Sequence, residues 1–160
     1  MILIHPSMVM VPDPRLREKS KEVLHTVEVK DIISLMREVL TSCRECGYHT
    51  VSIAAPQVGV NVRIFIIDST AIQLVAINPT ITKLHGEQQS IEGCLSFPLG
   101  VRFTLKRANV VKFHYTDQNG FQHSMKFHDL YAAIVQHEVD HLDGILMDDR
   151  VYHTKVKKEV

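Results

Sequence analysis

The sequence predicts an α+β fold in which antiparallel sheets pack around a central helix. Three features lead to this expectation. A segment with helical spacing of apolar residues lies early in the chain, a second lies near its end, and short strand-like segments separated by turn residues lie between them. Strands grouped between two helices favour antiparallel sheet. The 160 residues contain no linker or internal repeat, so we expect a single domain over residues 1–160.

The first expected elements are a turn and a long helix. Residues 12–17 begin with Pro-Asp-Pro, which is typical of a turn or of the start of a helix. Residues 29–46 carry apolar side chains at helical spacing, with Asp31 near the start and Gly47 as the stop. Residues 50–58 are mostly small, and we expect an irregular stretch there.

Strands are expected in the middle of the chain. Residues 61–67 and 74–77 are rich in β-branched and aromatic residues, and the Asn-Pro pair that follows is expected to break the second strand. Residues 109–116 and 121–128 flank the sequence Asp-Gln-Asn-Gly, and this pattern predicts a hairpin.

A second helix is expected over residues 130–142, and this is the helix around which the sheets would pack. Asp129 can cap its first turn, and Asp143 with Gly144 can end it. From about residue 151 the chain continues as a short basic tail that contains three lysines.

The charge balance and the cysteines exclude several classes of protein. Lysine plus arginine (18) equals aspartate plus glutamate (18), so bulk charge gives no reason to expect nucleic-acid binding. No apolar stretch approaches the roughly 18 residues of a membrane span, and the N-terminus lacks a signal-peptide pattern. Three cysteines, an odd number, favour free thiols or metal ligands in a reducing compartment. We therefore expect a cytoplasmic protein.

The strongest chemical signal lies in the second helix, which reads His137-Glu138-Val139-Asp140-His141. Histidines four residues apart share one face of a helix, so both imidazoles can reach one metal ion. Glu138 follows the first histidine and can act as a general base beside the ion. The plainer alternative is a surface helix end that is rich in histidine by chance. The expected helix favours the metal site, because the motif needs helical geometry.

A catalytic metal site needs a third protein ligand, and Cys94 is the leading candidate. It lies in a Glu-Gly-Cys-Leu-Ser sequence, and its thiolate would partly neutralise a divalent ion. A buried structural cysteine is an equally good interpretation. Cys43 and Cys46 form a Cys-x-x-Cys pair at the end of the first helix. Such a pair could be redox-active or contribute to a second metal site, but without a second pair two ordinary thiols are the favoured interpretation.

Residues 53–59 place one polar amide among small residues, in the sequence Ile-Ala-Ala-Pro-Gln-Val-Gly. This composition favours a close approach of the backbone to a ligand, and Gln57 could donate a hydrogen bond to an oxyanion. Taken alone, the stretch is more typical of an ordinary loop.

Together these three segments resemble the peptide deformylase family. That family is identified by Gly-x-Gly-x-Ala-Ala-x-Gln, Glu-Gly-Cys-Leu-Ser and His-Glu-x-Asp-His, in that order. The second motif is intact at 92–96 and the third at 137–141, whereas the first, at 50–57, has Thr50 and Ser52 in place of both glycines. The resemblance covers nearly the whole chain, and three ordered motifs are far more specific than His-Glu-x-x-His alone.

The resemblance implies a metal-dependent hydrolase that removes the formyl group from the N-terminal formylmethionine of nascent polypeptides and releases formate. Cys94, His137 and His141 would hold one divalent ion, with Fe(2+) expected and Zn(2+) or Ni(2+) as alternatives. Glu138 would take a proton from water and pass it to the departing amine. The Gln57 side chain and the Leu95 backbone N–H would stabilise the oxyanion.

The methionine side chain of such a substrate needs an apolar pocket. Leu130, Ala133 and Ile134 precede His137 on the same helix face, and Val51 could add a wall. Ordinary core packing explains each of these residues about as well. Ser52 places a side chain where the family usually has none, so we expect it to border the pocket, where its hydroxymethyl group could narrow the space and change substrate preference.

Two other hypotheses stay open. One is a catalytically weak, deformylase-like protein that binds peptide N-termini, and it is motivated by Thr50 and Ser52. The other is an unrelated His-Glu-x-x-His zinc peptidase, which the short chain and the cysteine ligand disfavour. For a deformylase we expect a monomer whose partners are N-formylmethionyl nascent peptides, with transient ribosome contact and neither membrane nor sequence-specific nucleic-acid binding.

Overall fold

A computed structural model of the protein describes residues 4–25 and 28–151. Nearly all of the expected basic tail lies outside these residues. The elements follow one another along the chain as η1 (Pro14–Arg17), α1 (Lys30–Glu45), β1 (Ser52–Ala54), η3 (Ala55–Val58), β2 (Ile64–Asp68), β3 (Gln73–His85), β4 (Gln88–Glu92), β5 (Phe103–Arg107), β6 (Val110–Thr116), β7 (Gln122–His128), α2 (Asp129–Leu142) and η4 (Met147–Arg150), where η marks a 3₁₀ helix.

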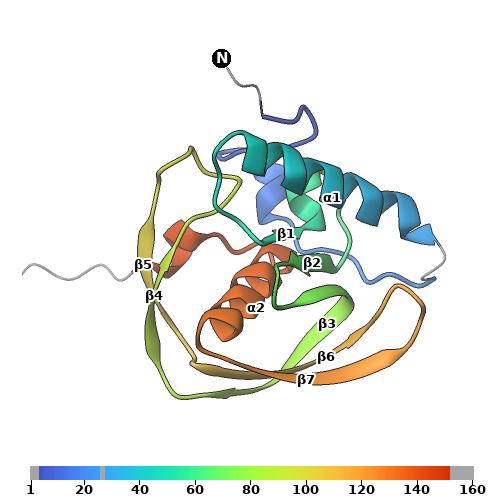
Figure 1. Ribbon diagram of the computed structural model, residues 1–160, viewed down its shortest axis with the longest axis vertical. Coiled ribbons are helices and arrows are strands. Elements are labelled where there is room, and N and C mark those ends of the chain that lie inside the picture. Colours follow the sequence, from blue (N-terminus) through green and yellow to red (C-terminus); the bar gives the residue numbers. More distant parts are fainter. Residues whose placement is uncertain (1–3, 26–27, 152–160) are drawn as a thin grey trace, which may run out of the picture.

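The strands form two antiparallel sheets around helix α2. The larger sheet has the order β1-β2-β3-β6-β7, and β4 pairs with β5 separately. Figure 1 shows α2 in the middle of the molecule, with β1, β2 and α1 above it, the long strands β3, β6 and β7 below, and β4 with β5 at its side. This arrangement confirms the predicted α+β class and the central helix.

Strand β2, in the larger sheet, is buried on both faces. Side chains alternate across a strand, and here Ile64 and Ile66 pack in the cluster that contains the apolar face of α1. Phe65 and Ile67 point the other way and pack with residues of α2. The sheet therefore separates the two helices and supports α2 from one side.

Several local expectations are confirmed. The helix expected over 29–46 is α1, and Gly47 follows it with φ +94°, a conformation that favours glycine. The expected hairpin is β6 and β7, which pair from Val110 with His128 to Thr116 with Gln122. Gly120 in its turn has φ +87°. These elements are encoded locally, by apolar spacing and turn residues.

The expected break after residue 77 is wrong, because β3 continues to His85. The register against β6 shifts between Ile77 and Thr80, so the chain absorbs the Asn-Pro pair as an irregularity within the strand. Asn78 adopts φ +49°, and its side chain accepts a hydrogen bond from the Val23 N–H and donates one to the Val23 carbonyl, both at 2.8 Å. These contacts hold the irregular backbone in place.

Three other local expectations need correction. The stretch 50–58 is not irregular throughout, since it contains β1 and η3. Strands β4 and β5 were not expected, because β4 is mostly polar and a one-sided strand of five residues gives a weak pattern. The Asp129 side chain does not cap α2. Asp129 instead has φ +49°, and its N–H donates to the Asn109 carbonyl at 2.8 Å.

Within residues 4–25 and 28–151, neither long helix has the length and the apolar run that crossing a membrane would require.

Candidate functional site

Helix α2 carries the two histidines of the His-Glu-x-Asp-His sequence on one face, as its spacing predicted. The ring centroids of His137 and His141 are 5.0 Å apart. His141 is buried, and His137 lies at the edge of a cavity. The helix ends directly after them, at Leu142, and Gly144 follows with φ +72°.

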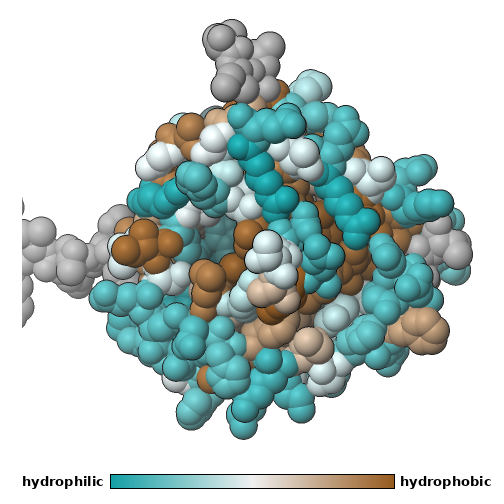
Figure 2. Space-filling model, in the orientation of Figure 1, coloured by the Kyte–Doolittle hydropathy of each residue, from teal (hydrophilic) through white to brown (hydrophobic). Residues whose placement is uncertain are grey.

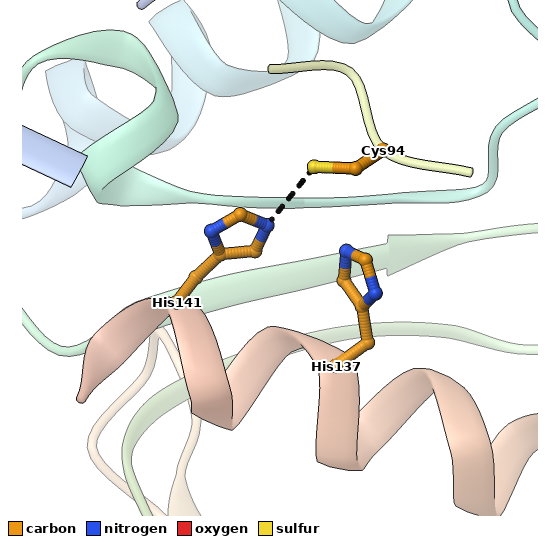
Figure 3. A group of neighbouring side chains, drawn as sticks. All are labelled: Cys94, His137 and His141. Atoms are coloured by element: carbon orange, nitrogen blue, oxygen red, sulfur yellow. Dashed lines mark hydrogen bonds between the residues drawn. The ribbon is translucent and has the colours of Figure 1, made fainter. Parts of the chain in front are cut away.

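Cys94 faces these histidines from the segment that follows β4. Its Sγ lies 3.3 Å from His141 Nε2, and one ligand atom from each of Cys94, His137 and His141 lies within 4.8 Å of the other two. Figure 3 shows both imidazoles extending from α2 toward the thiol. One thiolate and two imidazoles form a donor set that suits a divalent transition metal. These three residues therefore fit the metal site that the sequence predicts.

Glu92 and Arg107 orient His137. Glu92 Oε2 lies 2.8 Å from His137 Nδ1, and because an ionised carboxylate only accepts, Nδ1 carries the proton and Nε2 is left for an ion. Arg107 holds Glu92 with two hydrogen bonds, of 2.8 and 2.9 Å. Burial by itself would raise the pKa of Glu92, but the hydrogen bonds from Arg107 and His137 outweigh burial and lower that pKa to about 2. Glu92 is thus ionised at neutral pH.

The surroundings of His137 and His141 shift the pKa values of the two imidazoles in opposite directions. Burial, with the charge of His137 as a smaller cause, lowers the pKa of His141 well below its usual range, which keeps that imidazole neutral. Burial also opposes protonation of His137, but the nearby Cys94 and Glu92 raise its pKa. The surroundings of His137 therefore attract positive charge, which a divalent cation can supply in place of the proton.

Glu138 is buried beside the histidines, with 2% of its surface exposed. Its Oε1 accepts a hydrogen bond of 2.6 Å from Ser52 Oγ, and its Oε2 has no hydrogen-bond partner among the described residues. Burial raises the pKa of Glu138, and the neighbouring His137 and the Ser52 hydrogen bond offset part of this rise. A carboxylate with a raised pKa and a free oxygen is well suited to accept a proton.

The Gln57 side chain lies next to Cys94. Its Oε1 accepts a 2.9 Å hydrogen bond from the Ala54 N–H, which fixes the orientation of the amide. Its Nε2 then donates to Cys94 Sγ at 3.4 Å and to Ser96 Oγ at 3.2 Å. The N–H groups of Gln57 therefore lie at the site, and a substrate oxygen that accepts from Gln57 would have to displace Cys94 Sγ or Ser96 Oγ.

A cavity of about 280 Å³ opens beside these groups. In Figure 2 the surface is hollowed between β4 and α2, and hydrophobic side chains stand at the rim. Leu130 lies at this rim with 65% of its surface exposed. All five residues predicted to bind substrate line the cavity, together with Leu95, and they are Val51, Ser52, Leu130, Ala133 and Ile134.

The backbone at Ser52 is unstrained. Among the described non-glycine residues, positive φ occurs only at Asn78 and Asp129, so serine is accommodated at position 52 without backbone cost. Its neighbour Thr50 accepts a hydrogen bond from the Ser52 N–H and donates one to the Ser52 carbonyl, at 3.4 and 3.1 Å. The two residues that replace the glycines therefore interact with each other.

Sequence reasoning missed the contribution of Arg107 and gave Glu92 no role. Glu92 stands in a recognised motif, so its position was a usable signal. Arg107 gave no signal, because it reaches the site from β5, which was not expected as a strand. Cys43 lies outside the site, on the buried face of α1, where burial raises its pKa to about 11. It is therefore a thiol at neutral pH.

Comparisons with known proteins agree with this site. The family model described as polypeptide deformylase matches residues 6–157. A peptide deformylase from Dictyoglomus thermophilum is 41% identical over 150 residues, which cover 93% of this chain and 94% of that protein. One from Syntrophomonas wolfei is 37% identical, over 94% and 96% of the two chains.

Solved structures agree as well. The peptide deformylase of Synechococcus elongatus, in complex with actinonin, has a TM-score of 0.85 and 35% identity, and the match covers 96% of this chain and 84% of that one. The Thermotoga maritima peptide deformylase has a TM-score of 0.82 and 32% identity, over 91% and 96%. On its sequence, its fold and its cluster of metal-binding side chains, the chain belongs to the peptide deformylase family and is an enzyme of that class.

Proposed function

We propose that this chain hydrolyses the formamide bond of N-formylmethionyl nascent peptides, giving formate and a free N-terminal methionine. One observation carries the proposal most directly. The ligand atoms of Cys94, His137 and His141 lie within 4.8 Å of one another, and Glu138 and an apolar cavity lie beside them.

Cys94, His137 and His141 would hold one divalent ion. When bound, such an ion lowers the pKa of a water ligand and polarises a carbonyl oxygen. We propose Fe(2+) as the ion, with Zn(2+) and Ni(2+) as alternatives, because thiolate and imidazole ligands suit all three. The Glu92 carboxylate supports His137 in this role by fixing the proton on Nδ1.

Glu138 would act as the proton carrier. Its raised pKa and its Oε2, which has no hydrogen-bond partner among the described residues, support the transfer of a proton from water to Glu138 and then to the departing amine nitrogen. The Gln57 amide and the Leu95 N–H would stabilise the negative charge that develops on the formyl oxygen. The orientation of Gln57 by the Ala54 N–H supports its part, because the amide is held before substrate arrives.

The cavity would take the methionine side chain. Its apolar lining by Val51, Leu130, Ala133 and Ile134 matches an unbranched thioether better than a charged side chain. A polar or charged first residue would lose hydration there without gaining a partner. We therefore propose a preference for methionine at the formylated position.

Formate release from an N-formyl-Met tripeptide tests this function. The protein is purified anaerobically, its metal content is measured, and the N-acetyl-Met tripeptide serves as the matched control. Release from the formyl peptide and none from the acetyl peptide is the expected result. No release from fully metallated protein would favour a peptide-binding protein instead, whereas cleavage at internal peptide bonds would favour a zinc peptidase.

We further propose that residues 1–160 act as one domain and as a monomer. The three groups of core residues, which lie on both faces of the sheet and around η1 and η4, support one domain. A nascent-chain substrate and the odd number of cysteines, which is typical of a reducing compartment, support action in the cytoplasm with transient ribosome contact. The basic residues of the tail would favour such contact with a negatively charged surface. Size-exclusion chromatography with light scattering checks the monomer.

A further inference from the structure

The hydroxyl of Ser52 connects strand β1 to helix α2 across the candidate site. Ser52 Oγ and Glu138 Oε1 are 2.6 Å apart, although the two residues are separated by 86 positions in the sequence. A glycine at position 52, as in the family motif, has no atom that could make this contact. The hydrogen bond is therefore a consequence of this chain's departure from the motif.

Ser52 itself is firmly placed. It pairs with Ile67 of β2 in the antiparallel register, and Thr50 Oγ1 bonds to both its N–H and its carbonyl. The Val51 carbonyl accepts from the Asp68 N–H of β2, so the alternation of an antiparallel pair turns the backbone groups of Ser52 toward the free edge of β1. Thr50 occupies that edge. Thr50 and Ser52, the two residues that replace glycine, thus both help to fix the position of the Ser52 hydroxyl.

The Glu138 carboxylate, which the Ser52 hydroxyl contacts, has a hydrogen-bond partner for one of its two oxygens. Glu138 is buried, and its Oε2 has no hydrogen-bond partner in residues 4–25 and 28–151. The Ser52 bond is the contact that ties its carboxylate to a neighbouring strand. A short hydrogen bond from a hydroxyl to a carboxylate restricts the rotation of the carboxylate, so one oxygen is held by the protein and the other is left for a reactant.

We infer that Ser52 is a positioning residue for this enzyme, which holds Glu138 so that Oε2 faces the reacting groups. The inference rests on the proposed role of Glu138 in proton transfer. It predicts that the hydroxyl contributes to turnover and not to substrate affinity. If the Ser52 side chain were instead an obstacle in the cavity, removing it would improve substrate binding or turnover.

The test compares Ser52→Ala, Ser52→Gly and Ser52→Thr with the unaltered protein, all loaded with the same metal. Steady-state formate release from an N-formyl-Met tripeptide gives kcat and KM separately. We expect Ala and Gly to lower kcat about tenfold, with KM within about twofold, which is the scale of one lost hydrogen bond to a charged group. Thr, which keeps the hydroxyl, should restore most of kcat. Ser124→Ala, on the exposed edge of β7, is the matched control.

Two further measurements separate positioning from loss of the site. The metal-to-protein ratio should be the same in all variants. Crystal structures should show one Glu138 side-chain conformation in the unaltered protein and more than one in Ser52→Ala. Unchanged or increased kcat in Ser52→Ala or Ser52→Gly, or a change confined to KM, would overturn the inference. Failure of the proposed function is distinct, because then the unaltered protein itself would release no formate.

Discussion

Helix α2 contains two buried acids, Glu138 and Asp140, that lie two residues apart and differ in the number of hydrogen bonds that their carboxylates accept. Asp140 accepts hydrogen bonds from Arg107 Nη1 at 2.6 Å and from Arg150 Nη2 and Nε at 2.6 and 3.0 Å. Glu138 accepts one, from Ser52, and its second oxygen has no partner among the described residues. Two positions along a helix correspond to a rotation of about 200°, so the two carboxylates leave the helix on nearly opposite sides.

The difference separates a structural carboxylate from a reactive one. Buried polar groups in folded proteins are almost always hydrogen-bonded, because an unpaired group loses its hydration without compensation. Asp140 follows this rule and joins α2 to β5 and η4. Glu138 departs from it at the edge of a cavity that contains a candidate metal site. An unsatisfied buried group in such a place is a candidate for a functional role.

The largest expected effect distinguishes the two acids by activity. Glu138→Gln keeps the size of the side chain and removes its ability to accept a proton, so we expect kcat to fall about 1,000-fold. The midpoint of thermal unfolding and the metal content should be unchanged or higher, since a buried charge is removed. Formate release and calorimetry measure the two quantities. A variant that retains full turnover would remove Glu138 from the mechanism.

The second prediction distinguishes Asp140 from Glu138 by its contribution to the stability of the protein. Asp140→Ala leaves the buried Arg107 with one partner fewer, and we expect the free energy of unfolding to fall by roughly 3–5 kcal/mol. Urea unfolding of the metal-loaded protein measures this. Asp148→Ala, which removes an exposed ion pair with Arg17, is the control and should cost less than about 1 kcal/mol. An equal loss of unfolding free energy in Asp140→Ala and Asp148→Ala would contradict the structural role of Asp140.

The third prediction concerns pH and the neighbouring carboxylate of Glu92. Its pKa is lowered from an ordinary value of 4.5 to about 2 in the folded protein. The unfolded chain therefore takes up the proton first, and the stabilisation is complete above about pH 4.5 and is lost as the pH falls toward 2. The loss should reach about 3 kcal/mol.

Urea unfolding of metal-free protein at several pH values measures this dependence. Glu92→Gln should be less stable than the unaltered protein at pH 7, and the difference should shrink as the pH falls toward 2, because the variant lacks the titrating group. A difference in stability that stays constant between pH 7 and pH 2 would contradict the assignment of this pH dependence to Glu92.

The smallest expected effect concerns Cys94, the cysteine of the candidate metal site. Cys94→Ser replaces a thiolate with a weaker ligand, and we expect metal affinity to fall roughly 100-fold, with the fold retained. Competition with a chelator of known affinity measures it. Cys46→Ser, which changes a thiol outside the group Cys94, His137 and His141, should leave the affinity unchanged. Unaltered affinity in Cys94→Ser would exclude the thiolate as a ligand.

The sequence by itself determined the helices, the β6–β7 hairpin and the placement of His137 and His141. Each of these depends on spacing within a single segment, because helical periodicity and turn residues act over a few positions. The resemblance of three ordered motifs added the family, and it favoured the functional interpretations of Cys94 and Gln57 over a structural cysteine and an ordinary loop. The structure brings those residues together as expected.

Only the tertiary structure decided which polar side chains from distant parts of the sequence contact one another. Arg107 reaches both Glu92 and Asp140 because β5 packs beside α2, and no local pattern marks that arginine. Ser52 meets Glu138 because β1 forms the edge of the sheet that lies against α2. Contacts of this kind join residues far apart in the chain, and they depend on how whole elements pack. The different environments of Glu138 and Asp140 therefore arise from packing and not from their neighbours in the sequence.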